Sequence, residues 1–212
     1  MERIGDFHPF CELGEEEKEA LNKICVIKNY TKDSMVCYEG ECKEEFYYLL
    51  CGEVKIYKVN RFEGEIFLGL LKRGLLLDAQ EGECLNIFAN IECRSESKIA
   101  HFKMKGFEIL IEKYPLIMAL FYKEMQKKFV RFRELIKREL VFDSTAKIAY
   151  WLSCNLEEFN QYKKNENASF LNIQPETLSR ILKKMHRDNI ICTNEAGKIE
   201  ILDKEKLKAI YE

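Results

Sequence analysis

Side chains of the types that recognise DNA recur through residues 172–187. Arginine can bind guanine through two hydrogen bonds, glutamate can accept a hydrogen bond from cytosine, serine can bond to either base, and lysine suits phosphates. The residues of these types, with one threonine, are Glu176, Thr177, Ser179, Arg180, Lys183, Lys184 and Arg187. Together they could recognise double-stranded DNA.

The spacing within this stretch predicts a helix that begins at Pro175. Proline has a backbone angle that suits the first helical position, and it lacks an N–H group that would be unpaired there. Four apolar residues then recur at intervals of three and four, namely Leu178, Ile181, Leu182 and Met185. They form one face and leave the charged side chains on the other. An ordinary amphipathic surface helix has the same pattern, so the neighbouring elements must decide between the two interpretations.

The elements around this helix indicate a winged helix-turn-helix. A helix is predicted over residues 145–159, and a shorter one ends near Leu171. Asn172 then lies in the turn, where a left-handed backbone conformation is needed and asparagine tolerates it. After the charged helix, residues 190–202 have the pattern of a strand, a turn at 194–197 and a second strand. This is the pattern of a wing.

A long helix is predicted upstream, from Pro115 to Leu140. Apolar residues recur along it at intervals of three and four, among them Met118, Phe121, Met125, Phe129, Phe132 and Ile136. A stripe with three phenylalanines would be a large exposed apolar patch on a single chain. We therefore expect the same helix of a second subunit to cover it in a symmetric homodimer. The alternative is that the rest of the same chain covers it.

The N-terminal half is predicted to be rich in short strands. Residues 6–28 have a helical pattern with an acidic start. Short apolar runs separated by glycines follow up to residue 101, at 35–38, 46–50, 54–57 and 65–71. Strands at this spacing indicate a barrel or a sandwich. With the helices that follow, the expected fold class is α+β.

The composition is that of a folded protein without extreme charge. The chain has 212 residues, of which 47% are hydrophobic and 33% are charged, and its formal net charge is −2. This excludes a histone-like basic protein, so any DNA-binding surface must be local. No run approaches the roughly 20 apolar residues of a membrane helix, and the first residues lack the pattern of a signal peptide. We therefore expect a cytoplasmic protein with no membrane partner.

Most of the cysteines are expected to be packed in the core rather than to carry chemistry. Nine are present, an odd number, and no CxxC motif occurs. In a reducing compartment the odd number argues against a disulfide framework, and the missing motif argues against a zinc site. Most of the nine are expected to be ordinary buried apolar residues. A redox role for Cys42, which lies between Glu41 and Lys43, stays open.

Two motifs give the chain a family resemblance. One runs from Ala168 through Leu171 to Glu176-Thr-Leu-Ser-Arg180, and the other combines Tyr38-Glu-Gly-Glu41 with the run 46–57. On these residues the chain resembles the cyclic-AMP receptor protein/FNR family of bacterial transcription regulators along nearly its whole length. One departure is Asn172, which replaces the family's turn glycine.

The resemblance implies an α+β fold in three parts. These are a cyclic-nucleotide-binding-like β-roll sensor at 1–114, a dimerisation helix at 115–141 and a winged-helix DNA-binding domain at 142–212. It implies a homodimeric transcription regulator and not an enzyme, with double-stranded DNA and RNA polymerase as partners. The recognition motif is similar to that of the FNR-like branch, whose half-sites resemble TTGA. Glu176, Ser179 and Arg180 are therefore expected to read bases.

The resemblance also bears on the family's best-known ligands. Members that bind cyclic AMP hold its phosphate with an arginine, and the matching position falls here on about Ile87-Phe88. A buried phosphate needs that charge, so we expect no binding of cyclic AMP. An FNR-type iron–sulfur cluster is not expected either, because Cys11 and Cys25 lie far apart and the next cysteines fall within or beside predicted strands.

Haem binding stays open as a third kind of sensing, and it needs an axial ligand. The chain has three histidines, at positions 8, 101 and 186. His101 lies in a predicted strand and fits a structural histidine better than a ligand. His186 lies at the end of the charged helix and suits a phosphate contact or plain surface. His8 and Cys42 are the weak candidates for holding a cofactor, and the effector itself is unknown.

Two other function classes remain as alternatives. A cupin-like metal enzyme would need several histidines on adjacent strands, whereas the strand-rich region has only His101. A cyclic-nucleotide-binding regulatory subunit of another enzyme would need the missing phosphate contact, and it leaves the winged helix unexplained. A sequence-specific gel shift would favour the transcription regulator over both.

Overall fold

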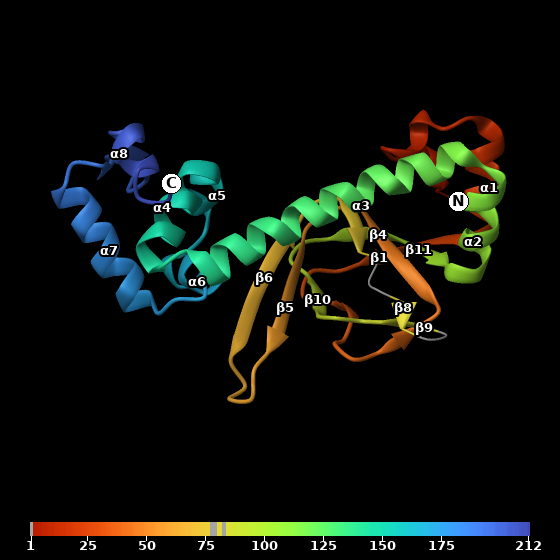
Figure 1. The fold of residues 1–212 in the computed structure, drawn as a ribbon, viewed down its shortest axis with the longest axis horizontal. Coiled ribbons are helices and arrows are strands. Elements are labelled where there is room, and N and C mark those ends of the chain that lie inside the picture. The colour runs from red at the N-terminus through yellow and green to blue at the C-terminus, as the bar shows by residue number, and fades with distance from the viewer. Residues whose placement is uncertain (1, 77–79, 82–83) are drawn as a thin grey trace. The chain divides into compact units, whose positions relative to one another are not determined.

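The chain folds into two compact units in a computed structural model that describes residues 2–76, 80–81 and 84–212. Residues up to Lys58 and Leu68–Phe132 form the first unit, and Val59–Phe67 and Arg133–Glu212 form the second. Figure 1 shows most of the strands in the first unit and most of the short helices in the second. The second unit therefore includes a short segment from the strand-rich half of the sequence.

The first unit is built on antiparallel β-sheets. The strands before residue 104 are β1 (Cys25–Tyr30), β2 (Met35–Cys37), β3 (Cys42–Lys43), β4 (Glu45–Cys51), β5 (Val54–Val59), β6 (Glu65–Leu71), β7 (Gly74–Leu76), β8 (Gln80–Glu81), β9 (Cys84–Asn86), β10 (Asn90–Cys93) and β11 (Ser97–Lys103). One sheet has the strand order β1-β11-β4-β7 and another has the order β2-β10-β5-β6. A smaller sheet has the order β3-β9-β8. The predicted α+β class is confirmed.

Strand β4 contributes to both layers of this core, because side chains on both of its faces are buried. Phe46, Tyr48 and Leu50 lie on one face and pack with the helices. Tyr47 and Leu49 lie on the other and pack with residues of the second sheet. Alternate residues of a strand point to opposite faces. A strand buried on both faces therefore appears in the sequence as a continuous apolar run.

Three helices cover the first unit's core. They are α1 (Glu15–Ile24), α2 (Met104–Lys113) and α3 (Pro115–Ile136), and two short 3₁₀ turns precede them at Ile4–Asp6 and Phe10–Glu12. α1 and α2 lie side by side at one end of the β1-β11-β4-β7 sheet (Figure 1). The predicted start of the long helix at Pro115 is confirmed, and a π-helical turn, Lys137–Val141, follows it. No described helix is long and apolar enough to cross a membrane.

One residue of the predicted dimer stripe belongs to this core instead. Phe121 is only 4% exposed. Its ring lies 5.7 Å from Phe46, 5.7 Å from Phe102 and 4.6 Å from Phe107 between centroids. The prediction that Phe121 contacts a second subunit is therefore wrong. The apolar surface of α3 is wider than a single stripe, and its own unit covers the side that carries Phe121.

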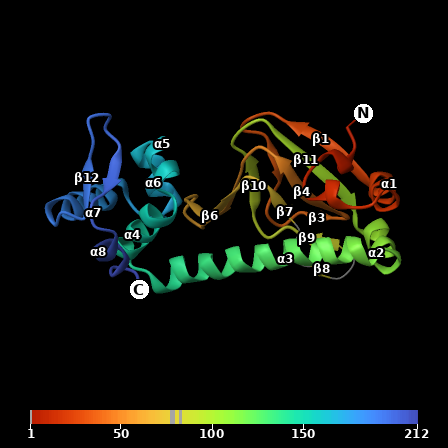
Figure 2. The same cartoon turned by 90° about the horizontal axis from the view of Figure 1, so that it is seen from above.

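The second unit is helical with a two-stranded hairpin. Its elements are α4 (Ser144–Cys154), α5 (Leu156–Gln161), α6 (Lys164–Phe170), α7 (Pro175–Arg187), β12 (Ile191–Thr193), β13 (Ile199–Ile201) and α8 (Lys204–Lys208). The prediction of one helix over 145–159 is wrong, because α4 ends at Cys154 and, after Asn155, α5 begins at Leu156. Figure 2 shows β12 of the hairpin beside α7. The predicted order of helix, turn, helix and wing is confirmed.

The cysteines depart from expectation at one pair. Cys42 and Cys84 form a disulfide that joins β3 to β9. The seven other cysteines are not in a disulfide. The sequence argued against a disulfide framework and did not predict this single bridge. An odd cysteine count argues against complete pairing, but it does not exclude a single bridge.

Candidate nucleic-acid interface

Helix α7 is held by its apolar face and offers its charged face to solvent. Leu178, Ile181 and Met185 are buried in the second unit's core, where they pack with residues such as Leu152 and Leu171. Leu182, the fourth residue of the predicted stripe, is partly buried against the same core. The helix starts at Pro175, as the sequence predicts. These buried side chains therefore fix the orientation of the charged face.

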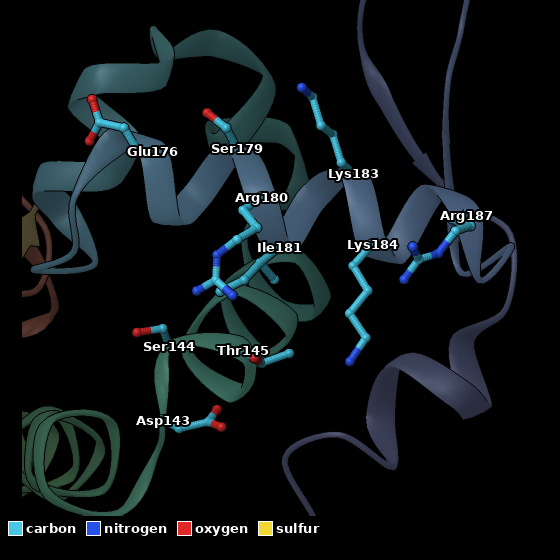
Figure 3. A pocket seen from close by; sticks show the side chains of 10 residues that line it. All are labelled: Asp143, Ser144, Thr145, Glu176, Ser179, Arg180, Ile181, Lys183, Lys184 and Arg187. Atoms are coloured by element: carbon cyan, nitrogen blue, oxygen red, sulfur yellow. The ribbon is translucent and has the colours of Figure 1, made fainter.

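The charged face of α7 lines an open groove. The groove is bounded by the start of α4 and by α7, and the residues that line it are Asp143, Ser144, Thr145, Glu176, Ser179, Arg180, Ile181, Lys183, Lys184 and Arg187. Six of the seven side chains predicted to bind DNA are in this set. Figure 3 shows Arg180 and Lys184 directed toward the start of α4, with Glu176, Ser179 and Lys183 on the other side of the helix.

The balance of charge in the groove favours an anionic partner. Four cationic side chains face two carboxylates, Asp143 and Glu176. Within the described part of the chain, Arg180, Lys183 and Lys184 have no ion-pair partner, and only Arg187 lies near a carboxylate, with 3.7 Å between its Nε and the Oδ1 of Asp188. Cations without a protein partner remain available for phosphates or bases. The groove thus has the electrostatic character of a nucleic-acid surface.

Ser179 and Thr177 differ from the other predicted contacts. The hydroxyl of Ser179 donates a hydrogen bond to the carbonyl of Pro175 at 2.7 Å, so its oxygen remains to accept one from a base amino group. Thr177 lies apart from the groove and lines a second depression together with Asn172 and Gln174. The structure therefore separates Thr177 from the other six. Its contact with DNA stays a prediction.

The turn before α7 is held by the segment 59–67 of the same unit. Asn172 has the predicted left-handed conformation, with φ of 53°. Its amide accepts a hydrogen bond from the Phe67 N–H at 2.8 Å and donates one to the Phe67 carbonyl at 2.9 Å. The Phe67 ring packs on Phe170 with 4.8 Å between centroids. Sequence reasoning missed this role, because the partner lies 105 positions away.

The wing is hydrogen-bonded to α5 and to the end of α7. Asn194 shapes its turn by accepting hydrogen bonds from the N–H groups of Ala196 and Lys198. Thr193 on β12 is hydrogen-bonded to His186 at the end of α7, at 3.0 Å. The Asn160 side chain bonds to both backbone groups of Ile199 on β13. The hairpin is therefore a fixed neighbour of the recognition helix.

The side chains considered as cofactor ligands have other partners. Cys42 is withdrawn as a candidate, because its sulfur is bonded to Cys84. His8 is exposed, and its Nδ1 lies 3.1 Å from a carboxylate oxygen of Glu12. Among the residues that the structure describes, no three metal-binding side chains lie close enough together to hold an ion.

His101 has the structural role that the sequence predicts. It is buried, and its ring nitrogens lie 3.0 Å from the Tyr30 hydroxyl and 3.2 Å from a Glu45 oxygen. Burial lowers its pKa, although the hydrogen bond to Glu45 opposes the effect. The ring is therefore neutral near pH 7, with both nitrogens occupied by protein groups.

Two domain families match the chain. Residues 147–210 match the Crp-like helix-turn-helix domain, and residues 27–114 match the cyclic nucleotide-binding domain. The first match contains α7 and the wing, and the second contains strands β2 to β11. The two matches fall on the C-terminal helical region and on the strand-rich region respectively.

Curated relatives align over most of the chain. It is similar to the cAMP-activated global transcriptional regulator CRP of Salmonella typhimurium, with 23% identity over 184 residues that cover 80% of this chain and 87% of that protein. The protein of the same name from Escherichia coli O157:H7 has the same identity and coverage.

Solved structures share the fold. FixK2 from Bradyrhizobium japonicum has a TM-score of 0.67 at 15% identity, over 89% of this chain and 98% of that one. A CooA mutant from Carboxydothermus hydrogenoformans has a TM-score of 0.70 at 16% identity, over 95% of this chain and 92% of that one. At these identities the similarity is one of architecture.

Proposed function

Because this chain is a DNA-binding transcription regulator of the Crp/Fnr family, we propose that it acts as a homodimer on a two-fold symmetric operator. Its homologues are transcription regulators and not enzymes. The observation that carries the proposal is the charged face of α7, which is exposed and has cations without protein partners. Two such helices about one DNA turn apart, roughly 34 Å, would enter successive major grooves.

The second subunit is proposed to bind along α3. Five of the six predicted interface residues are between 42% and 60% exposed, namely Met118, Met125, Phe129, Phe132 and Ile136. Large apolar side chains repeated on one helix face are costly in water and are covered efficiently by a two-fold partner. This supports the assignment of residues 115–141 to dimerisation, between a sensor at 1–114 and a DNA-binding domain at 142–212.

Side-chain chemistry suggests which residues of α7 contact bases and which contact phosphates. Glu176, Ser179 and Arg180 would read base edges, and by family resemblance the half-site is of the TTGA type. Lys183, Lys184 and Arg187 would bind phosphates, which adds affinity without sequence preference. Thr177 is proposed to contribute less to DNA binding, because it lies outside the groove.

The controlling signal is proposed to be something other than cyclic AMP. The Salmonella relative is named for activation by cAMP. Here the position of the phosphate-binding arginine falls on Ile87, which is 3% exposed in the apolar core, and on Phe88, whose ring lies 4.1 Å from the Lys58 ammonium. Neither side chain can bind a phosphate. The remaining signals are redox change, nitric oxide, haem or a small metabolite, or none at all.

The location and second partner follow from this function. A protein that regulates bacterial transcription works in the cytoplasm, where the chromosome is. Its output requires RNA polymerase, either recruited or blocked. Both are expectations from the family.

Selection of bound DNA from a random pool tests the proposed function. The purified chain should enrich an inverted repeat with TTGA-like half-sites, and cyclic AMP should leave the enrichment unchanged. The selection is run with and without air and nitric oxide, so that a signal dependence appears in the same data. Recovery of no common sequence under any of these conditions would contradict the proposal.

A further inference from the structure

Among the described residues, one disulfide is present, and it joins Cys42 to Cys84. Their Cα atoms are 5.7 Å apart on the neighbouring strands β3 and β9. Cys42 is exposed and Cys84 is half-buried, so Cys42 is the more accessible residue of the pair. Exposed disulfides are the ones that exchange with thiols. Cys11 and Cys154 are exposed as well, and both are free.

The disulfide lies between segments that lead into different sheets. β3 runs almost directly into β4, a strand of the β1-β11-β4-β7 sheet, and β9 leads into β10 of the β2-β10-β5-β6 sheet. β3 pairs with β9 through its two residues, and just beyond it Ile87 bonds to the backbone of Gly40 and Glu41. The disulfide adds a covalent link to this backbone pairing.

We propose that Cys42–Cys84 is a redox-responsive site that exchanges with small thiols and disulfides such as glutathione and thereby changes the affinity for DNA. In reducing compartments, disulfides are in most cases transient and serve catalysis or sensing. The predicted change in DNA affinity rests on the proposed function. It names the signal that the proposed function leaves open.

Two molecules of glutathione supply the two electrons that reduce the protein disulfide. The thiolate of the first attacks the Cys42 sulfur, the bond between Cys42 and Cys84 breaks, and Cys84 leaves as a thiolate that takes up a proton. The thiolate of the second attacks the glutathione sulfur of the mixed disulfide and releases Cys42 as a thiolate, which is protonated in turn. The protein disulfide gains two electrons, and the two glutathiones become one oxidised glutathione.

Strand pairing, the chain itself and two hydrogen bonds connect this site to the start of α7. β10 pairs with β5 through residues 90–93, and β5 continues into the segment Val59–Phe67 of the second unit. In that segment Phe67 is bound through its backbone to Asn172, three positions before α7 begins. A change in how β10 is held can therefore reach the start of α7.

The chemistry of the site is tested without DNA. The full chain is equilibrated with glutathione, from fully reduced to fully oxidised, free thiols are blocked with iodoacetamide, and peptides are identified by mass spectrometry. Cys42 and Cys84 should be alkylated in the reduced buffer and joined to each other in the oxidised one. Cys11 and Cys154, the exposed controls, should form no bridge within the chain. A Cys42–Cys84 bridge that never forms, or that persists in fully reduced glutathione, would overturn the proposal.

The output is tested by operator affinity in the same buffers. The affinity of the wild type should differ by about fivefold or more between the two end states, within the usual range of allosteric coupling. Cys42→Ser and Cys84→Ser should show the affinity of the reduced state in every buffer, whereas Cys11→Ser and Cys154→Ser should respond like the wild type. Equal affinities of the oxidised and reduced wild type would overturn the proposal. Normal exchange in a protein that binds no operator in either state would contradict the proposed function instead.

Discussion

At the scale of single residues, the face of α7 combines two kinds of recognition chemistry. Arg180 can bind a guanine through two parallel hydrogen bonds, and no carboxylate of the described chain competes for it. Lys183 and Lys184 end in point charges that suit phosphates in any sequence. Base readout and non-specific affinity should therefore respond to different substitutions.

Arg180→Ala should weaken binding to the operator by about 1–3 kcal/mol per half-site and relax the preference at one guanine. Lys183→Ala is the matched control, because it removes a charge from the same face. It should weaken all DNA sequences alike and lower the salt dependence of binding by about one phosphate contact. Fluorescence anisotropy on operator and scrambled fragments measures both. A uniform loss with Arg180→Ala would show that this side chain does not read a base.

Asn172 should contribute to stability through its side chain as well as its backbone. Asn172→Gly keeps the left-handed conformation but loses two hydrogen bonds to Phe67, at a cost of about 1–3 kcal/mol. Asn172→Ala should cost about 1 kcal/mol more, because alanine also resists that conformation. Urea unfolding of the two variants checks the order. A glycine variant as stable as the wild type would show that the bonds to Phe67 contribute nothing net.

His101 should make the protein less stable in mild acid. Burial holds its pKa below the ordinary 6.5, against the opposing effect of Glu45 and with further lowering by Lys28 and Lys43. As the pH falls through 6.5, the unfolded chain takes up a proton that the folded chain does not, so the free energy of unfolding falls. His101→Gln should flatten this dependence between pH 6.5 and 5, and the exposed control His8→Gln should not. Parallel curves for His101→Gln and the wild type would contradict this role.

At the scale of elements, α3 has two apolar sides, and its own unit covers only one of them. The side that carries Ile117 and Phe121 is buried in the first unit. The side that carries Phe129 and Phe132 is exposed. A helix that is apolar over so much of its surface needs cover on both sides, which is the physical basis for proposing a dimer.

Phe129→Asp should convert the dimer to a monomer. The side chain is 60% exposed on the single chain, so the substitution places a charge in the proposed interface without disturbing the core. Lys123→Asp, on an exposed position of the same helix, is the charge control and should remain dimeric. Sedimentation velocity gives the mass, and circular dichroism checks the fold. A monomeric wild type, or a dimeric Phe129→Asp, would contradict the assignment.

The sequence predicts elements well where the local signal is strong. Pro175 and the spacing of Leu178, Ile181 and Met185 were enough to place α7, because proline and a period of 3.6 are local properties. The helix break at Asn155 carries no glycine or proline and was missed. Periodicity identified Phe121 as apolar but could not tell which chain covers it.

The features of the site that depend on distant partners could not be predicted. Nine cysteines allow many pairings, and only the fold brings Cys42 next to Cys84. The residue type of Asn172 predicted its backbone conformation, but its bond to Phe67 depends on a strand from the other half of the sequence. The separation of Thr177 from the groove likewise follows from packing around α7.

At the scale of the whole molecule, a nearly neutral protein presents a basic reading surface. The formal net charge is −2, yet four cations line the groove at α7 with two carboxylates. Local charge is enough for phosphate binding, because interactions between exposed charges are screened beyond about 8–10 Å at physiological salt. A local cluster of cations is therefore compatible with a nearly neutral chain.

The central claim is that two copies of α7 read the two halves of a symmetric operator. The most direct test is an anisotropy titration of the selected operator against the same duplex with one half-site scrambled, at one salt concentration. Scrambling one half-site should weaken binding by about 3 kcal/mol or more, since several mismatched pairs each cost about 1–3 kcal/mol. Equal affinities for the two duplexes would contradict it.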